Sequence, residues 1–192
     1  MRSPLVLVSP SSTAATRRSP AALTSCSTRV SAWTACRLRC GSATRRGDRP
    51  EPDLLVLDTS GLVALLDRDD AHPDAVADVI TSDVGPLYLS PFVLQEVDYL
   101  VSRRIGTEPA LRVLEDVAGG AYRLETFEAA DLVVAMAIMR RYRDLSVGLA
   151  DASVVVIAAR HGTDRVLTLD ERDFRALRPL QGGSFTLLPA DA

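Results

Sequence analysis

The stretch LLVLDTSGLVALL at residues 54–66 decides the fold. Four consecutive apolar residues at 54–57, ended by Asp58, are typical of a buried strand in a parallel sheet. The residues that follow, 60–66, favour a helix. A buried strand that passes directly into a helix predicts the first unit of an α/β sheet.

The same alternation continues to the end of the chain. Ser90 is expected to cap, and Pro91 to start, a helix that continues to residue 104. We expect further strands at 87–89, 122–126, 165–169 and 185–188, and helices at 73–80, 91–104, 108–118, 128–143 and 149–160, with a last short helix before the final strand. The sequence therefore predicts a three-layer α/β/α fold with a central parallel sheet of four to five strands.

Composition fits a globular protein and removes several kinds of chemistry. The chain has 192 residues, 47% of them apolar, which suits one domain or one domain with an appendage. All 22 basic residues are arginine. The absence of lysine excludes a P-loop, a Schiff base, a Ser-Lys dyad and a phosphate-sensing lysine.

Charge divides the chain near residue 52. Residues 1–52 hold nine arginines and two acids, a formal charge of +7, whereas the remainder holds 13 arginines and 23 acids, a charge of −10. Residues 1–52 are also rich in Ser and Thr and show no apolar periodicity. We expect a disordered Ser/Arg-rich leader at 1–52, and a folded domain at 53–192.

Three interpretations of the leader remain open. It resembles a transit peptide in composition, it suits a basic arm for nucleic acid, and it also fits a disordered segment from a start codon assigned too early, which we favour. Its thiols, Cys26, Cys36 and Cys40, lack a nearby histidine and are one ligand short of a closed zinc site. No run reaches the length of a membrane span, so we expect a cytoplasmic protein without a membrane partner.

Two aspartates follow expected strands directly. Asp58 and Asp170 should project from the carboxyl ends of their strands, where ligands bind in open α/β sheets. Either residue can instead be an ordinary N-cap of the next helix.

Two further acids fall on apolar helix faces. At 100° per residue, Glu96 lies within an apolar arc, while Gln95 and Asp98 fall outside it. Asp151 lies among valines and alanines, with Ser153 on the opposite face, which we expect to be exposed. The alternatives are a carboxylate reaching out from the rim for Glu96 and a neutral or arginine-paired carboxylate for Asp151.

One cleft at the sheet edge can collect Asp58, Glu96, Asp151 and Asp170. Carboxylates ~5 Å apart repel by about 3 kcal/mol per pair at an effective dielectric of 20, so such a cluster needs counter-charge. Mg²⁺ or Mn²⁺ supplies it best, because these ions prefer oxygen ligands. Asp173 is either a fifth ligand or an exposed acid at a helix start. The hydroxyl groups of Ser60 and Thr168 can donate hydrogen bonds that orient the ligands. The alternative is that Ser60 is only a cap residue and Thr168 only a strand residue.

These acids stand in blocks that resemble those of a known family. The segments LVLDTSGLVALLD, LSPFVLQEVDYLV, DLSVGLADASVVVIAARHG and VLTLDERDFRALRP are similar, in order, to the four acidic blocks of PIN domains, above all the VapC-type ribonuclease toxins. The resemblance covers residues 53 to about 188 and leaves the leader out. It implies that the four acids bind Mg²⁺ or Mn²⁺ and cleave RNA, that an antitoxin blocks the cleft, and that the protein is a homodimer.

The predicted function is therefore a metal-dependent endoribonuclease, the toxin of a type II toxin–antitoxin system, acting on tRNA, rRNA or mRNA. A divalent ion can activate water without a histidine. This suits a chain whose histidines, His72 and His161, stand in a loop and at a helix end. The charge of −10 opposes RNA binding, although arginine clusters at 103–104 and 140–143 can contact RNA or an acidic antitoxin segment, if they are not simply solvated helix ends.

Two other classes compete with the nuclease. A phosphatase with Asp58 as nucleophile is disfavoured, because Ser60 replaces a second acid and no lysine can hold the phosphate. A PIN-fold RNA-binding or scaffold protein without toxin activity is the second alternative. Buried like charges disfavour it, since a scaffold has no use for them.

Overall fold

A computed structural model describes residues 54–67, 73–82 and 85–192. The expectations for residues 1–52, for their three cysteines and for His72 lie outside this part of the chain. Within it, five parallel strands form one sheet in the order β3-β2-β1-β4-β5. Their bounds are β1 (Leu55–Leu57), β2 (Leu87–Leu89), β3 (Arg123–Leu124), β4 (Arg165–Leu167) and β5 (Thr186–Leu188).

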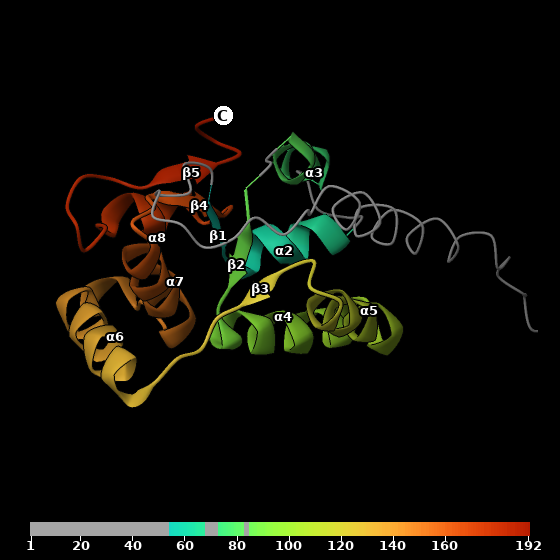
Figure 1. The fold of residues 1–192 in the computed structure, drawn as a ribbon, viewed down its shortest axis with the longest axis horizontal. Helices are drawn as coiled ribbons and strands as arrows, with labels where there is room; N and C mark the ends of the chain where they lie inside the picture. The colour runs from blue at the N-terminus through green and yellow to red at the C-terminus, as the bar shows by residue number, and fades with distance from the viewer. Residues whose placement is uncertain (1–53, 68–72, 83–84) are drawn as a thin grey trace, which may run out of the picture.

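Helices cover both faces of this sheet. Figure 1 shows α2, α3, α4 and α5 on one side and α6, α7 and α8 on the other, which confirms the three-layer expectation. The bounds are α2 (Thr59–Leu66), α3 (Pro73–Ser82), α4 (Pro91–Arg104), α5 (Thr107–Ala118), α6 (Ala129–Arg141), α7 (Leu149–His161) and α8 (Glu171–Ala176), with a 3-10 turn, η1 (Arg143–Leu145), after α6.

The order of the strands places a switch point beside β1. The chain runs outward from β1 through β2 to β3, and then returns to the other side of β1 to form β4 and β5. The loops that leave β1 and β4 at their carboxyl ends therefore diverge to opposite faces. In open α/β sheets ligands bind at such a point.

Burial explains why the central elements form. All three residues of β1 have no exposed surface, and residues 152–158 of α7 are buried around the whole helix. The edge strand β3 is exposed and only two residues long, shorter than the expected 122–126, because it has one neighbour and little apolar surface to bury. Similarly, β4 ends at Leu167, two residues before its expected end, although Thr168 N still donates a hydrogen bond to Leu188 O.

One glycine allows α2 to approach β4 closely. A Cβ atom built on Gly61 would lie 2.9 Å from the carbonyl oxygen of Leu167. Any side chain at position 61 would push the first turn of α2 away from the end of β4. The two strand-end loops that carry Asp58 and Asp170 are therefore held together by backbone packing.

In the described part of the chain, no helix is both long enough and apolar enough to cross a membrane.

Candidate metal and nuclease site

Asp58 stands at the end of β1 and is almost fully buried, with 3% of its surface exposed. Its Oδ2 atom accepts hydrogen bonds from Ser60 Oγ at 2.6 Å, Thr168 Oγ1 at 2.8 Å and Ser60 N at 3.2 Å. Burial raises the pKa of this carboxyl, and the hydrogen bonds from Ser60 and Thr168 oppose that rise. Asp58 is both the N-cap of α2 and a buried acid held in one orientation.

The same two hydroxyl groups connect Asp58 to the loop after β4. Leu169 N donates to Ser60 Oγ at 2.8 Å, and Asp170 N donates to Thr168 Oγ1 at 3.0 Å. Each hydroxyl accepts from this loop and donates to Asp58. The roles expected for Ser60 and Thr168 therefore have a geometric basis, since both hydroxyls contact the Asp58 carboxylate directly.

Asp170 is half-buried and caps α8. Its Oδ1 atom accepts a hydrogen bond from Asp173 N at 3.1 Å. The carboxylate of Asp173 is also half-buried, and its Oδ1 atom has no hydrogen-bond partner in the described residues; it lies 4.0 Å from Nε of Arg172. Asp173 thus orients Asp170 through its backbone N–H and also presents a buried carboxylate oxygen beside it.

Asp151 lies in the first turn of α7, where its Oδ2 atom accepts a hydrogen bond from Gly148 N at 2.8 Å. The pKa of Asp151 is raised to about 6. Burial is the largest cause, the Gly148 hydrogen bond opposes it, and the negative charges of Asp58, Glu96 and Asp170 add to the rise. The fold therefore brings Asp58, Glu96 and Asp170 within electrostatic range of Asp151.

Glu96 differs from its expected environment. It is exposed on α4, whereas Asp98, expected to face water, is half-buried. The helical arithmetic was wrong here because it assumed one buried face: α4 packs against α2, α5 and α7, so its buried positions extend to Asp98 while Glu96 lies outside them. Glu96 nevertheless reaches inward, since Thr59 Oγ1 donates a 2.8 Å hydrogen bond to its Oε2 atom.

A buried pair of serines joins α4 to α7. We expected Ser153 on the solvent side of α7, but it is fully buried, and its Oγ atom lies 2.6 Å from Oγ of Ser90. The Ser153 Oγ atom also lies 2.6 Å from Ala150 O, and Phe92 N donates to Ser90 Oγ at 3.2 Å. Since each hydroxyl has one proton, the arrangement that satisfies all four groups runs from Phe92 N–H through Ser90 and Ser153 to Ala150 O.

Thr59, Ser90 and Ser153 are the supporting residues that sequence reasoning missed. Thr59 follows Asp58 directly, so a hydroxyl beside the first acid was a usable signal. Ser90 was expected only as a helix cap. Nothing in the sequence marks Ser153, because its hydrogen-bond partner is 63 positions away in the chain.

The donor set suits a hard divalent cation. Each of the four acids accepts a hydrogen bond that fixes its orientation, and none of them pairs with an arginine in the described part of the chain. Oxygen ligands without counter-charge are what Mg²⁺ or Mn²⁺ require. As the side chains are placed, however, no three acidic, histidine or cysteine residues among those described approach closely enough to hold an ion. Three of the acids thus act on Asp151 through their charge, but the described residues do not form a coordination sphere.

Within the part of the chain that the structure describes, histidine is not part of this group of acids. His161 ends α7, where its Nε2 atom lies 3.2 Å from Oε1 of Glu125 and its ring centroid lies 4.1 Å from that of Tyr88. The described arginines of the two expected clusters, Arg103, Arg104, Arg140, Arg141 and Arg143, are all exposed.

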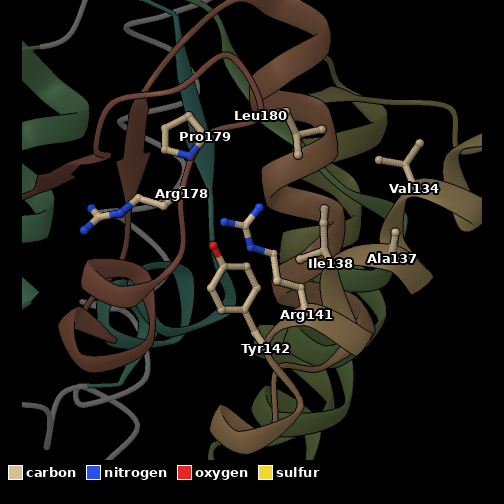
Figure 2. A pocket seen from close by; sticks show the side chains of 8 residues that line it. All are labelled: Val134, Ala137, Ile138, Arg141, Tyr142, Arg178, Pro179 and Leu180. Carbon is tan, nitrogen blue, oxygen red and sulfur yellow. The ribbon is translucent and has the colours of Figure 1, made fainter.

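A separate pocket of about 200 Å³ opens between α6 and the loop after α8 (Figure 2). Apolar side chains and two arginines line it: Val134, Ala137, Ile138, Arg141, Tyr142, Arg178, Pro179 and Leu180. None of the four acids contributes to its wall. The pocket is therefore a different surface from the acidic site.

Comparison with known proteins identifies the family. The PIN-domain model matches residues 55–178. Ribonuclease VapC26 of Mycobacterium tuberculosis is 44% identical over 135 residues, which cover 70% of this chain and all of that protein. The chain belongs to the PIN-domain family and, within it, to the VapC group.

Solved structures agree on the fold. The Mycobacterium tuberculosis VapC20 structure, described as a toxin that cleaves the sarcin-ricin loop, gives a TM-score of 0.55 at 22% identity and covers 58% of this chain and 86% of that one. The structure of VapBC2 from Rickettsia felis, bound to a DNA fragment from its promoter, gives a TM-score of 0.50 at 15% identity. It covers 70% of this chain and 96% of that one. At these identities the likeness concerns the fold alone.

Proposed function

We propose that this protein is the toxin of a type II toxin–antitoxin system and acts as a Mg²⁺- or Mn²⁺-dependent endoribonuclease in the cytoplasm, with residues 53–192 as its PIN domain. Similarity to a VapC ribonuclease supports the proposal. The observation that carries it is the state of Asp151, whose pKa is raised to about 6 by burial and by three carboxylates from other elements. A carboxylate in this setting repels its neighbours until a cation joins them.

The chain's own residues prepare the site for that ion. Asp58, Glu96, Asp151 and Asp170 would hold it, and Asp173 is a further candidate beside Asp170. Ser60 and Thr168 hold the Asp58 carboxylate, and Thr59 holds that of Glu96. When bound, such an ion supplies Lewis-acid activation of a water for in-line attack on a phosphodiester. The hydrogen bonds reduce the reorganisation that binding requires, because the oxygen atoms are already oriented.

The direct test is cleavage of total RNA by the full chain with Mn²⁺ or with EDTA, followed by mapping of the ends. We expect discrete cuts that need the ion, and the mapped ends will show whether tRNA, rRNA or mRNA is the substrate. Asp151→Asn should lower the cleavage rate by about a hundredfold or more, because it removes a ligand charge from the centre of the site.

Asp131→Asn is the matched control for that variant. Asp131 occupies the same position in the first turn of α6 and accepts the same kind of backbone hydrogen bond, but it lies outside the acidic group. Its substitution should change the cleavage rate by less than about twofold. Equal losses in the two variants would contradict the assigned site.

One observation favours the second candidate, a PIN-fold RNA-binding or scaffold protein without toxin activity. As placed, the described acids are not close enough together to form a coordination sphere. That candidate predicts RNA binding that does not depend on the ion, and no cleavage with either Mg²⁺ or Mn²⁺. The same RNA experiment therefore separates the two functions.

Two apolar surfaces are available for the proposed protein partners, a cognate antitoxin and a second copy of the chain. The outer face of α6 exposes Leu132, Val133, Val134 and Met136 beside the pocket in Figure 2, and α5 exposes Leu111 and Leu114. Grouped exposed apolar residues of this kind mark protein contacts. The mass of the full chain in solution, measured alone and with its co-expressed antitoxin, tests whether each contact forms.

A further inference from the structure

An exposed aromatic side chain stands beside the acidic site. Tyr99 on α4 is 53% exposed, and among the described residues it is the one aromatic in the set of strongly exposed large apolar side chains. The chain has few aromatic residues, 5% in all. More than half of the Tyr99 surface is therefore accessible to a ligand.

Spacing places this ring next to Glu96. Residues three and four positions apart are neighbours on a helix surface, so Glu96, Tyr99 and Arg103 follow one another along one exposed face of α4. Glu96 is connected to the site by its hydrogen bond to Thr59, and its charge acts on Asp151. A molecule that reaches Glu96 along this face therefore passes over Tyr99.

Arg103 gives this face positive charge. Its guanidinium carbon lies 5.6 Å from the centroid of the Tyr99 ring, and Arg104 follows at the end of the helix. Residues 53–192 carry a formal charge of −10, so this arginine pair offsets some of that negative charge on the exposed face of α4. A ring with a cation over it suits a ligand that has both a flat π surface and an anionic group.

The other two tyrosine–arginine pairs of the described chain do not offer such a face. Tyr88, with Arg123 at 5.6 Å, is 7% exposed, and His161 packs against its ring. Tyr142, with Arg141 at 5.5 Å, is half-buried in the wall of the separate pocket. The pair on α4 is thus distinguished by its exposure and by its place one turn from a predicted ligand.

We propose that Tyr99 and Arg103 form a platform on α4 that stacks one unpaired nucleobase of the RNA substrate and binds an adjacent phosphate, next to the acidic site. The inference rests on the proposed nuclease function and makes it more specific. Bases within an A-form helix are stacked on each other and cannot reach a side chain, so the platform selects single-stranded or looped RNA.

Binding of a 5′-labelled, unstructured oligoribonucleotide, measured by fluorescence anisotropy in Mn²⁺, tests the platform. The reference is the full chain with Asp151→Asn, which slows cleavage during the measurement. Adding Tyr99→Ala should weaken binding by about fivefold to a hundredfold, the range for one lost base-stacking contact. Tyr99→Phe should recover most of this loss because it keeps the ring. A duplex of the same sequence should bind equally with and without Tyr99→Ala.

Arg103→Ala tests the phosphate contact separately. It should reduce the slope of log affinity against log salt concentration by about 0.7, the value for one phosphate contact on a single strand. Leu124→Ala, 47% exposed on β3, is the control and should leave the affinity unchanged. In the cleavage assay, Tyr99→Ala should raise KM and leave kcat nearly unchanged.

Failure of the platform and failure of the nuclease give different results. If the wild type cleaves RNA and Tyr99→Ala cleaves with the same KM, the platform is wrong and the nuclease stands. If Tyr99→Ala lowers the mass in solution without changing RNA affinity, this face is a contact between copies and the platform is wrong. If the wild type neither binds nor cleaves RNA, both proposals are wrong.

Discussion

The first turns of α6 and α7 contain the same local structure with opposite electrostatics. In each, an aspartate at the third helical position accepts a hydrogen bond from the backbone N–H of the residue before the helix. The distance is 2.7 Å from Glu128 N to Asp131 and 2.8 Å from Gly148 N to Asp151. This arrangement is one half of a capping box, and it stabilises a helix start.

The surroundings make the two carboxylates different. Asp131 lies 2.8 Å from the Arg160 guanidinium, and its pKa is lowered by the Glu128 hydrogen bond and by Arg160. Burial raises the pKa of Asp151 to about 6, and the negative charges of Asp58, Glu96 and Asp170 add to the rise, with no arginine paired to it among the described residues. A helix-capping aspartate recognised in the sequence is therefore a poor guide to function. Residues from distant segments decide whether its charge is neutralised by an arginine or remains available to bind a cation.

Metal binding should show the largest difference between these two acids. With Mn²⁺ about a hundredfold above its dissociation constant, the melting temperature of the wild type should rise by roughly 5–10 °C. Asp151→Asn should lose most of this rise, and Asp131→Asn should keep it, as measured by differential scanning fluorimetry with EDTA as the baseline. An equal rise in both variants would show that the ion binds elsewhere.

The next largest difference should be in how much the contacts that hold each helix start contribute to stability. Ser153→Ala removes a buried hydroxyl and leaves Ser90 without its partner, which should lower stability by about 1–3 kcal/mol. The corresponding anchor of α6 is the surface ion pair of Arg160, and Arg160→Ala should lower stability by less than about 1 kcal/mol. Urea unfolding measures both values. A larger loss in Arg160→Ala would reverse the assigned importance of the two anchors.

The smallest expected effect is on the pH dependence of the melting temperature in EDTA, which should change in opposite directions in Asp151→Asn and Asp131→Asn. The folded-state pKa of Asp151 lies above the ordinary 3.8, so the folded protein binds this proton more tightly than the unfolded chain does. The charged form therefore destabilises the fold fully above pH 6, and the penalty disappears below about pH 4. Asp151→Asn should raise the melting temperature by a few degrees at pH 7.5 and not at pH 4.

Asp131→Asn should do the reverse. Its folded-state pKa is lowered from 3.8, so the charged form stabilises the fold above that pH, and the contribution is lost as the pH falls through the lower folded-state value. The variant should therefore melt below the wild type at pH 7.5. Thermal melts across pH 4–8 check both variants, and shifts of the same sign in the two would contradict the comparison.

Sequence reasoning worked best where a single element sufficed. The run at residues 54–57 indicated the buried strand β1, because only a strand covered on both faces tolerates continuous apolar residues. Asp58 and Asp170 were expected at strand ends, and the structure places Asp58 directly after β1 and Asp170 in the loop after β4. The helix faces were less predictable: Glu96 is exposed and Ser153 is buried, contrary to expectation, since α4 and α7 each contact several elements.

By itself, the sequence determined the alternation of strands and helices and the identity of the acids, because apolar periodicity and strand punctuation are local properties. Only the tertiary structure decided which acids interact electrostatically and which hydroxyl groups donate hydrogen bonds to them. The contact from Thr168 to Asp58 spans 110 residues and that from Thr59 to Glu96 spans 37, and no local pattern encodes such pairs. The physical reason is that burial and the electric field of neighbouring charges depend on distances in space, which the chain fixes only when β1 and β4 lie side by side.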